Sequence, residues 1–168
     1  MLFNSYQFIF FFLPVVLIVF FVLGKRNNHT VALAWLVGCS LFFYSWWNPI
    51  YLLLMLFSIL FNYLFGVLLT SEASGERKRK WCLIIGVSLN IGLLAYFKYT
   101  NFFIDQINIA FNLSFHVEKI LLPLAISFFT FQQIAYLADC YKEGARQYSL
   151  IDYALFVSFF PQLIAGPI

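Results

Sequence analysis

Long apolar runs alternate with short polar connectors along the whole chain. Most of the runs approach the roughly 20 residues that a helix needs to cross the hydrocarbon core of a bilayer. Five of them predict membrane-spanning helices, at Tyr6–Leu23, Val31–Trp47, Ile50–Thr70, Trp81–Phe97 and Ile120–Tyr141. The pattern predicts an all-α fold, a polytopic transmembrane helical bundle that forms a single membrane domain over residues 1–168.

Three sequence features shape the predicted spans. Pro14 predicts a kink in the first span, because proline lacks a backbone donor and its ring clashes with the preceding turn. Asn48-Pro49 predicts a tight turn that joins the second and third spans into a helical hairpin. Lys98 is expected to end the fourth span, where its long side chain can reach the head groups.

Two further segments differ from a simple span. From Tyr99 to Phe111, apolar residues recur at helical spacing among Asn, Asp and Gln, which predicts an interfacial helix along the membrane surface. After the polar loop Lys142–Asp152, the apolar segment Tyr153–Ile168 is broken by Pro161 and by Gly166-Pro167. We expect this last segment to be re-entrant or half-helical, although a simple loop between two spans would also fit the pattern.

Composition excludes a soluble domain. Hydrophobic residues make up 63% of the 168 residues and charged residues only 10%, whereas about a quarter of the residues of a soluble domain are charged. The net charge of +3 does not indicate nucleic-acid binding, because the Lys and Arg residues occupy short connectors rather than one face.

The basic residues predict the orientation. Eight of the ten lie in connectors 24–30, 71–80 and 142–152, which share one side of a five-span bundle, while Lys98 and Lys119 lie on the other side. Basic connectors favour the cytoplasm, so the N-terminus is expected outside the cell. The four-residue basic run Arg77–Lys80 is interpreted as a topology determinant at an anionic leaflet.

Polar residues on the fifth span mark the first part of a candidate site. Gln132, Tyr136 and Asp139 are spaced by four and three residues, which places them on one side of a helix. Polar groups within lipid-length segments are costly, so this stripe indicates a polar interior. The alternative is that Asp139 is interfacial and pairs with Lys142 or Arg146, while Gln132 bonds a neighbouring helix.

The second part of the candidate site is the broken segment. Pro161, Gln162, Gly166 and Pro167 lie in an apolar stretch where two prolines leave carbonyls that lipid cannot satisfy. Such backbone needs protein or water around it. All seven residues are therefore candidates for the lining of a polar core.

No catalytic residue or metal site is predicted within the chain. His29 and His116 lie near no arrangement typical of a catalytic triad. Cys39, Cys82 and Cys140 lack the paired spacing of metal ligands, so they are expected to be small buried residues, with lipidation of Cys82 or Cys140 as the alternative.

Four stretches of sequence carry a resemblance to a known family. They are FFYSWWNPIYLLLM (42–55), YFKYTNFF (96–103), LPLAISFFTFQQIAYLADCYKEGA (122–145) and SLIDYALFVSFFPQLIAGPI (149–168). Together they resemble the membrane-bound O-acyltransferase family, in particular the bacterial branch that includes the alginate O-acetyltransferase membrane component.

The resemblance implies a bacterial inner-membrane enzyme that transfers an acyl group, acetyl in that branch, to hydroxyls of an exported polysaccharide or cell-envelope glycan. It further implies opposed funnels that meet in mid-membrane, an acyl thioester donor (acyl-CoA or an acyl carrier) on the cytoplasmic side, no bound cofactor, and periplasmic or extracellular partners in acetyl transfer.

The family's active-site histidine lies far downstream of the Gly-Pro-Ile segment. The chain is therefore expected to be an N-terminal part of the fold, truncated before the catalytic half and inactive alone. Two rival hypotheses remain: a small multi-span transporter or flippase-like protein whose polar stripe forms a translocation path, and a non-catalytic membrane assembly subunit.

Overall fold

The computed structural model describes residues 5–25, 29–71, 75–111, 120–143 and 148–165, and these contain helices and no β-strand. A π-helical turn (Phe8–Phe12) is followed by α1 (Leu13–Lys25), α2 (His29–Trp47), α3 (Pro49–Thr70), α4 (Glu76–Phe111), α5 (Ile126–Glu143), α6 (Leu150–Ser158) and α7 (Phe160–Ala165). The predicted all-α class is confirmed. Four stretches are long and apolar enough to cross a membrane: Phe8–Lys25, His29–Trp46, Pro49–Thr70 and Glu76–Phe111.

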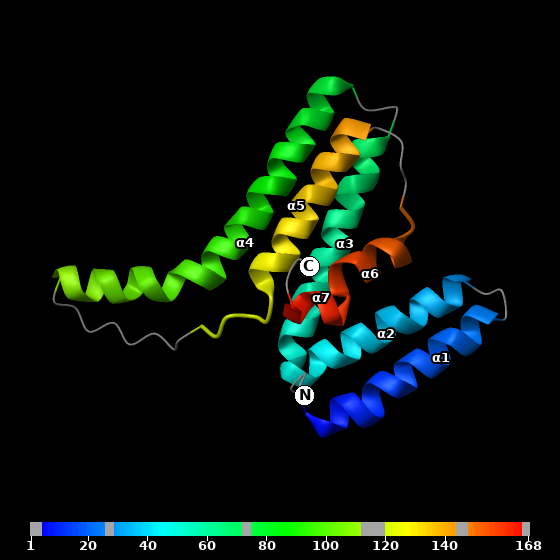
Figure 1. The fold of residues 1–168 in the computed structure, drawn as a ribbon. Helices are drawn as coiled ribbons and strands as arrows, with labels where there is room; N and C mark the ends of the chain where they lie inside the picture. The colour runs from blue at the N-terminus through cyan, green and yellow to red at the C-terminus, as the bar shows by residue number, and fades with distance from the viewer. Residues whose placement is uncertain (1–4, 26–28, 72–74, 112–119, 144–147, 166–168) are drawn as a thin grey trace.

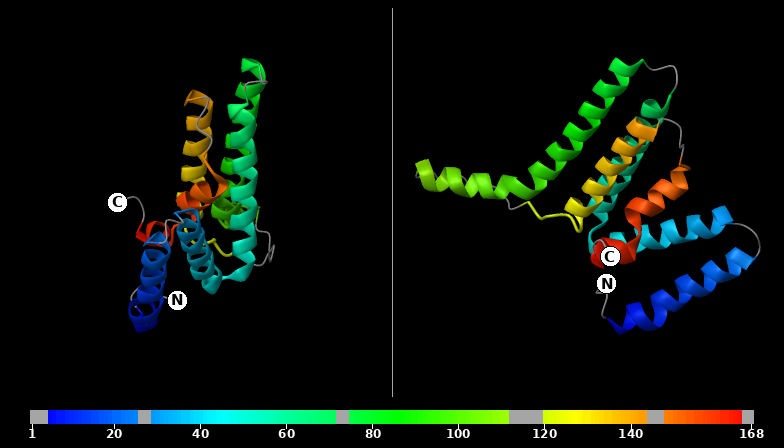
Figure 2. Two further views of the ribbon diagram at one scale, coloured as in Figure 1. Left: turned by 90° about the vertical axis from the view of Figure 1, so that its right-hand side faces the viewer. Right: turned by 45° about the horizontal axis from the view of Figure 1, so that its top comes forward.

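The helices form two groups. α3, α4 and α5 run side by side as a three-helix bundle, and the antiparallel hairpin α1–α2 is inclined to it (Figure 1). α6 lies between the groups and packs chiefly on α2, while α7 turns across the end of the hairpin (Figure 2). The last part of the chain thereby joins its two halves.

The predicted turn at Asn48 is confirmed. The Asn48 side chain accepts a hydrogen bond of 2.9 Å from the backbone N–H of Ile50, and Pro49 occupies the first helical position. The second and third spans nevertheless do not pack against each other along their lengths, as the expected helical hairpin would. α2 packs mainly on α1 and α6, so α2 and α3 diverge from the corner (Figure 1).

A π-helical turn at Phe8–Phe12 lies directly before α1, in which Pro14 is the second residue. The kink predicted at Pro14 stays a prediction. Proline removes one helical hydrogen bond and crowds the carbonyl of the preceding turn. A wider turn relieves this crowding without ending the helix.

The fourth predicted span has both ends wrong. α4 begins at Glu76 rather than Trp81, so the basic run is helical, and it continues through Lys98 to Phe111. The helix bends instead of ending, and its last part leaves the bundle (Figure 1). Thr100 Oγ donates to the carbonyl of Tyr96, a bond of the kind that bends helices. The surface location of residues 99–111 stays a prediction.

The fifth predicted span begins six residues later than expected. Residues 120–125 are not helical, and α5 starts at Ile126. Pro123 disfavours helical backbone in the residue before it, and Ala125 has a φ of 56°, which lies outside the right-handed helical region.

Tyrosine and asparagine side chains hold this extended segment. Tyr44 donates to the carbonyl of Leu124 over 3.2 Å, and Tyr51 donates to the carbonyl of Leu121 over 2.6 Å. Asn101 bonds both the N–H and the carbonyl of Ile120. These side chains satisfy backbone groups that a helix would otherwise satisfy, which irregular backbone in a membrane protein requires.

The predicted break in the C-terminal segment is confirmed. α6 ends at Ser158, and α7 begins at Phe160 directly before Pro161. α6 starts at Leu150, three residues earlier than expected, because Ser149 caps it by accepting from the N–H of Asp152. Gly166 and Pro167 lie outside the described residues.

Candidate functional site

A network of buried side-chain amides crosses the three-helix bundle. Asn62 of α3 and Asn90 of α4 donate to each other's side-chain oxygens over 3.2 and 2.6 Å. Gln133 of α5 accepts from Asn62 and from the Ser58 hydroxyl, over 3.0 and 2.7 Å. All four side chains are buried, so the network links α3, α4 and α5 at their centre.

Small residues let the same three helices approach closely. A β-carbon at Gly66 of α3 would lie 2.6 Å from ring carbons of Tyr136, so the tyrosine ring of α5 rests directly on the α3 backbone. A β-carbon at Gly86 of α4 would lie 2.9 Å from Leu137. Both contacts fix the rotation of α5 and hence the direction in which its polar residues point.

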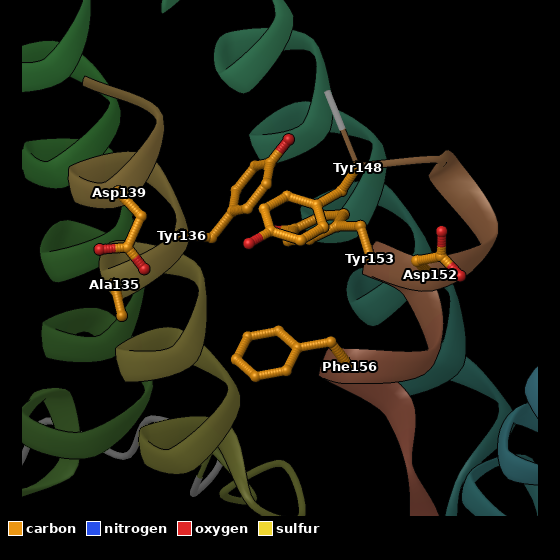
Figure 3. Close-up of a pocket in the computed structure, with 7 residues that line it drawn as sticks. All are labelled: Ala135, Tyr136, Asp139, Tyr148, Asp152, Tyr153 and Phe156. Atoms are coloured by element: carbon orange, nitrogen blue, oxygen red, sulfur yellow. The ribbon is translucent and has the colours of Figure 1, made fainter. Parts of the chain in front are cut away.

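A cavity of about 290 Å³ opens between α5 and α6. Its lining, drawn in Figure 3, consists of Ala135, Tyr136, Asp139, Tyr148, Asp152, Tyr153 and Phe156. The rings of Tyr136 and Tyr153 lie 4.0 Å apart between their centroids. Tyr153 is buried, and its hydroxyl has no hydrogen-bond partner in the described part of the chain. The cavity therefore combines an aromatic interior with a free buried hydroxyl.

Two carboxylates flank this cavity, one on each helix (Figure 3). Asp152 accepts from the Ser149 hydroxyl over 2.6 Å as part of the α6 cap. Asp139 is exposed, and Arg146 lies outside the described residues. The proposed role of Asp139 in the core and its alternative as an interfacial ion pair both stay predictions.

Gln132 connects the two walls. It is buried on α5, and its Nε2 donates to the carbonyl of Phe156 on α6 over 3.2 Å, while its Oε1 has no partner among the described residues. This bond satisfies a carbonyl close to the end of α6, where the helical pattern stops before Pro161. Gln132 therefore stabilises the broken segment. This contact is the hydrogen bond to a neighbouring helix that the alternative interpretation predicts for Gln132.

Gln162 lies apart from the other polar candidates. It lines a separate, open hollow of about 360 Å³ that includes Asp152, Phe156 and Phe159. The two hollows share Asp152 and Phe156, so they adjoin each other along α6. The structure thus places Tyr136 and Asp139 in the lining of the α5–α6 cavity and Gln162 in the lining of the adjoining hollow.

The amide network was not predicted from the sequence. Asn62 and Asn90 are the single amides of the predicted spans Ile50–Thr70 and Trp81–Phe97, and Gln133 lies directly beside Gln132. The signal was present, because an amide at the centre of a membrane span calls for a partner in a neighbouring helix.

The arrangement can bind and orient a polar ligand. Carboxylates and tyrosine hydroxyls line the cavity between α5 and α6, and within the described residues no histidine lies there. His29 is exposed at the first residue of α2. No three of the described His, Cys, Asp and Glu residues are grouped as a metal site would require.

Comparison with known proteins identifies relatives over the whole chain. It is 44% identical to a peptidoglycan O-acetyltransferase of Helicobacter pylori and 39% identical to a probable alginate O-acetylase of Pseudomonas aeruginosa, covering 37% and 32% of those proteins. A probable alginate O-acetylase of Pseudomonas putida is 38% identical and 35% covered. The chain is thus similar over its whole length to members of the membrane-bound O-acyltransferase family, as the sequence resemblance predicts. It spans about a third of the length of these relatives. No family model and no solved structure matches it.

The membrane character and the recognised family are confirmed by the apolar helices and by the relatives. The α5 and α6 segments that carried the resemblance are the two walls of the cavity.

Proposed function

We propose that the chain forms part of a membrane O-acyltransferase that moves an acetyl group to hydroxyls of a cell-envelope polysaccharide. The observation that carries the proposal is similarity over the whole chain to proteins named peptidoglycan O-acetyltransferase and alginate O-acetylase. These names favour acyl transfer over a transporter, a flippase or an assembly subunit.

In this proposal the α5–α6 cavity forms part of the wall of the substrate passage. Transfer to a hydroxyl needs the acceptor oxygen held close to the acyl carbon and a group that takes the hydroxyl proton. Tyr136, Tyr153 and Asp139 supply hydrogen-bonding groups that can orient a ligand there. We assign no residue of the chain to the proton transfer.

The amide network holds α5 in position and thereby supports the proposed role of the α5–α6 cavity. Tyr136 rests on Gly66, and Gln133, three residues before it on α5, is tied to Asn62. A site needs a rigid framework to hold its groups in position. The buried polar contacts of α3, α4 and α5 provide that framework.

We further propose that the donor is an acyl thioester, acyl-CoA or an acyl carrier, supplied from the cytoplasm, and that the N-terminus faces outward from the inner membrane. The contacts of Arg79 with the carbonyls of Leu69 and Tyr141 support part of this topology, because they place the ends of α3 and α5 together. Tyr51 and Leu121 meet at the other ends of those helices. The acceptor lies outside, with periplasmic or extracellular acetyl-transfer proteins as partners.

Topology is tested by labelling single cysteines in intact cells with a membrane-impermeant reagent. Cysteines near position 116 should react from outside, and cysteines replacing Arg77 or Lys80 should react only after the membrane is opened. The reverse pattern would refute the orientation.

Activity is tested by deleting the gene that encodes the chain and measuring acetate released by mild alkali from purified envelope glycans. We expect ester-linked acetate to fall at least tenfold and to return with the wild-type gene. Asp139→Asn and Gln132→Leu should restore less acetate than Ser88→Ala, which changes an exposed hydroxyl on α4. Unchanged glycan acetylation after deletion would contradict the proposed function.

A further inference from the structure

The four basic residues Arg77–Lys80, which follow Glu76 at the start of α4, differ in their surroundings. Arg79 Nε donates to the carbonyl of Leu69 over 2.8 Å, and its Nη2 donates to the carbonyl of Tyr141 over 2.8 Å. Its guanidinium also lies 5.5 Å from the centre of the Tyr141 ring. Arg79 is therefore committed to the bundle, whereas Arg77, Lys78 and Lys80 are exposed.

Helical spacing explains this division. Gly86 and Asn90 follow Arg79 by seven and eleven residues, which places all three on the same face of α4, and both are buried against the bundle. Arg77 lies on the opposite face, four residues before Trp81. The run thus presents one cation inward and three outward.

The outward face continues into a surface suited to lipid tails. Trp81 is 60% exposed, and Ile84 and Ile85 are exposed by 42% and 48%. Tryptophan is enriched at the boundary between lipid tails and head groups. If Trp81 marks that boundary, the three exposed cations in the turn before it lie at the depth of the head groups.

The local charge favours an anionic partner. Glu76 is the one acidic residue in the first turn of α4, against three exposed cations. Lysine binds phosphate as a point charge, and arginine can bind it with two hydrogen bonds. Basic residues next to a membrane surface attract anionic lipids.

We propose that Arg77, Lys78 and Lys80 bind the phosphate head groups of anionic phospholipids, with Trp81 seated beside the upper part of the tails. The partner is lipid rather than an acidic polypeptide because the cations are continuous with an apolar, lipid-compatible face on the same helix. This surface is separate from the α5–α6 cavity, and it does not depend on the proposed acyl transfer.

The test uses the chain in vesicles that contain a small fraction of lipid with brominated tails, which quench nearby tryptophan fluorescence. Brominated phosphatidylglycerol is compared with brominated phosphatidylcholine, and the Trp81 signal is obtained by subtracting the spectrum of Trp81→Phe. We expect phosphatidylglycerol to quench Trp81 several-fold more effectively at equal fractions.

The triple variant Arg77→Gln, Lys78→Gln, Lys80→Gln should lose this preference. The matched control Lys98→Gln, which removes an exposed cation further along α4, should keep it. Equal quenching by the two lipids in wild type, or an unchanged preference in the triple variant, would overturn the proposal. Equal quenching in wild type would instead favour an acidic polypeptide as the partner of the basic surface.

Loss of positive charge can alter membrane insertion, so a second measurement uses the unaltered chain. Salt screens exposed charges, and the preference of Trp81 for phosphatidylglycerol should therefore shrink steadily as the salt concentration rises. A preference that does not respond to salt would also overturn the proposal.

Discussion

Asn62 and Asn90 exchange side-chain hydrogen bonds across the interface of α3 and α4. Each amide also bonds a carbonyl of its own helix, four residues earlier. The pair therefore satisfies groups that would otherwise be stranded among apolar side chains, and it fixes the register of the two helices.

Replacing Asn90 by Leu should lower the free energy of unfolding by about 1–2 kcal/mol, because the side-chain oxygen of Asn62 loses the donor on Asn90 and stays buried. The measurement is a titration with a denaturing detergent followed by circular dichroism. Ser88→Leu on the exposed side of α4 is the control and should change little. Equal effects of the two variants would refute the structural role of the pair.

Gly66→Ala should be destabilising by about 1–3 kcal/mol, because the new methyl group overlaps the ring of Tyr136 and forces it away from α3. The same shift should change the cavity, since the ring of Tyr136 packs against the tilted ring of Tyr153. Gly92→Ala on α4 meets nothing within 4 Å, so it should be neutral or stabilising by up to about 1 kcal/mol. Thermal unfolding of both variants in the same detergent checks the contrast.

Arg79→Lys should weaken the end of the bundle although it keeps the charge. A single ammonium group cannot reproduce the forked contact with two carbonyls. Amide hydrogen exchange should become faster in the last turns of α3 and α5. Arg77→Lys, at an exposed position, is the control, and faster exchange there too would show that the effect is not due to the contact.

Tyr51→Phe should loosen the extended segment before α5, because the carbonyl of Leu121 loses its hydroxyl donor. A cysteine introduced at the exposed Leu122 reports this change through its rate of labelling, which should rise several-fold. Tyr96→Phe removes a hydroxyl from an exposed tyrosine and should leave the rate unchanged. An unaltered rate in Tyr51→Phe would show that the hydroxyl does not hold the segment.

Local sequence signals predicted the parts of the fold that depend on local chemistry. Asn48-Pro49 forms a turn and Pro161 interrupts a helix, whatever the tertiary contacts of the neighbouring residues. Lys98 misled the prediction, because a lysine that reaches the head groups is equally compatible with a helix that bends and continues. Residues 120–125 misled it because apolar composition alone cannot distinguish a helix from extended backbone held by distant tyrosines.

The candidate site was predictable only in part. The spacing of Gln132, Tyr136 and Asp139 placed them correctly on one helix, and the structure adds the α6 wall that Tyr153 and Phe156 supply. The amides of Asn62, Asn90 and Gln133 are far apart in sequence, so their meeting follows from the packing of three helices. Helical periodicity within one segment cannot reveal such a contact.

The two acceptors of Arg79 become available at different times during synthesis. Leu69 precedes the arginine by 10 residues, whereas Tyr141 follows it by 62. A nascent chain emerges from its N-terminus, so α3 and α4 can pair while half of the guanidinium still bonds water. The second bond of Arg79 can form only after α5 has been synthesised, so the arginine joins this end of the three-helix bundle late in assembly.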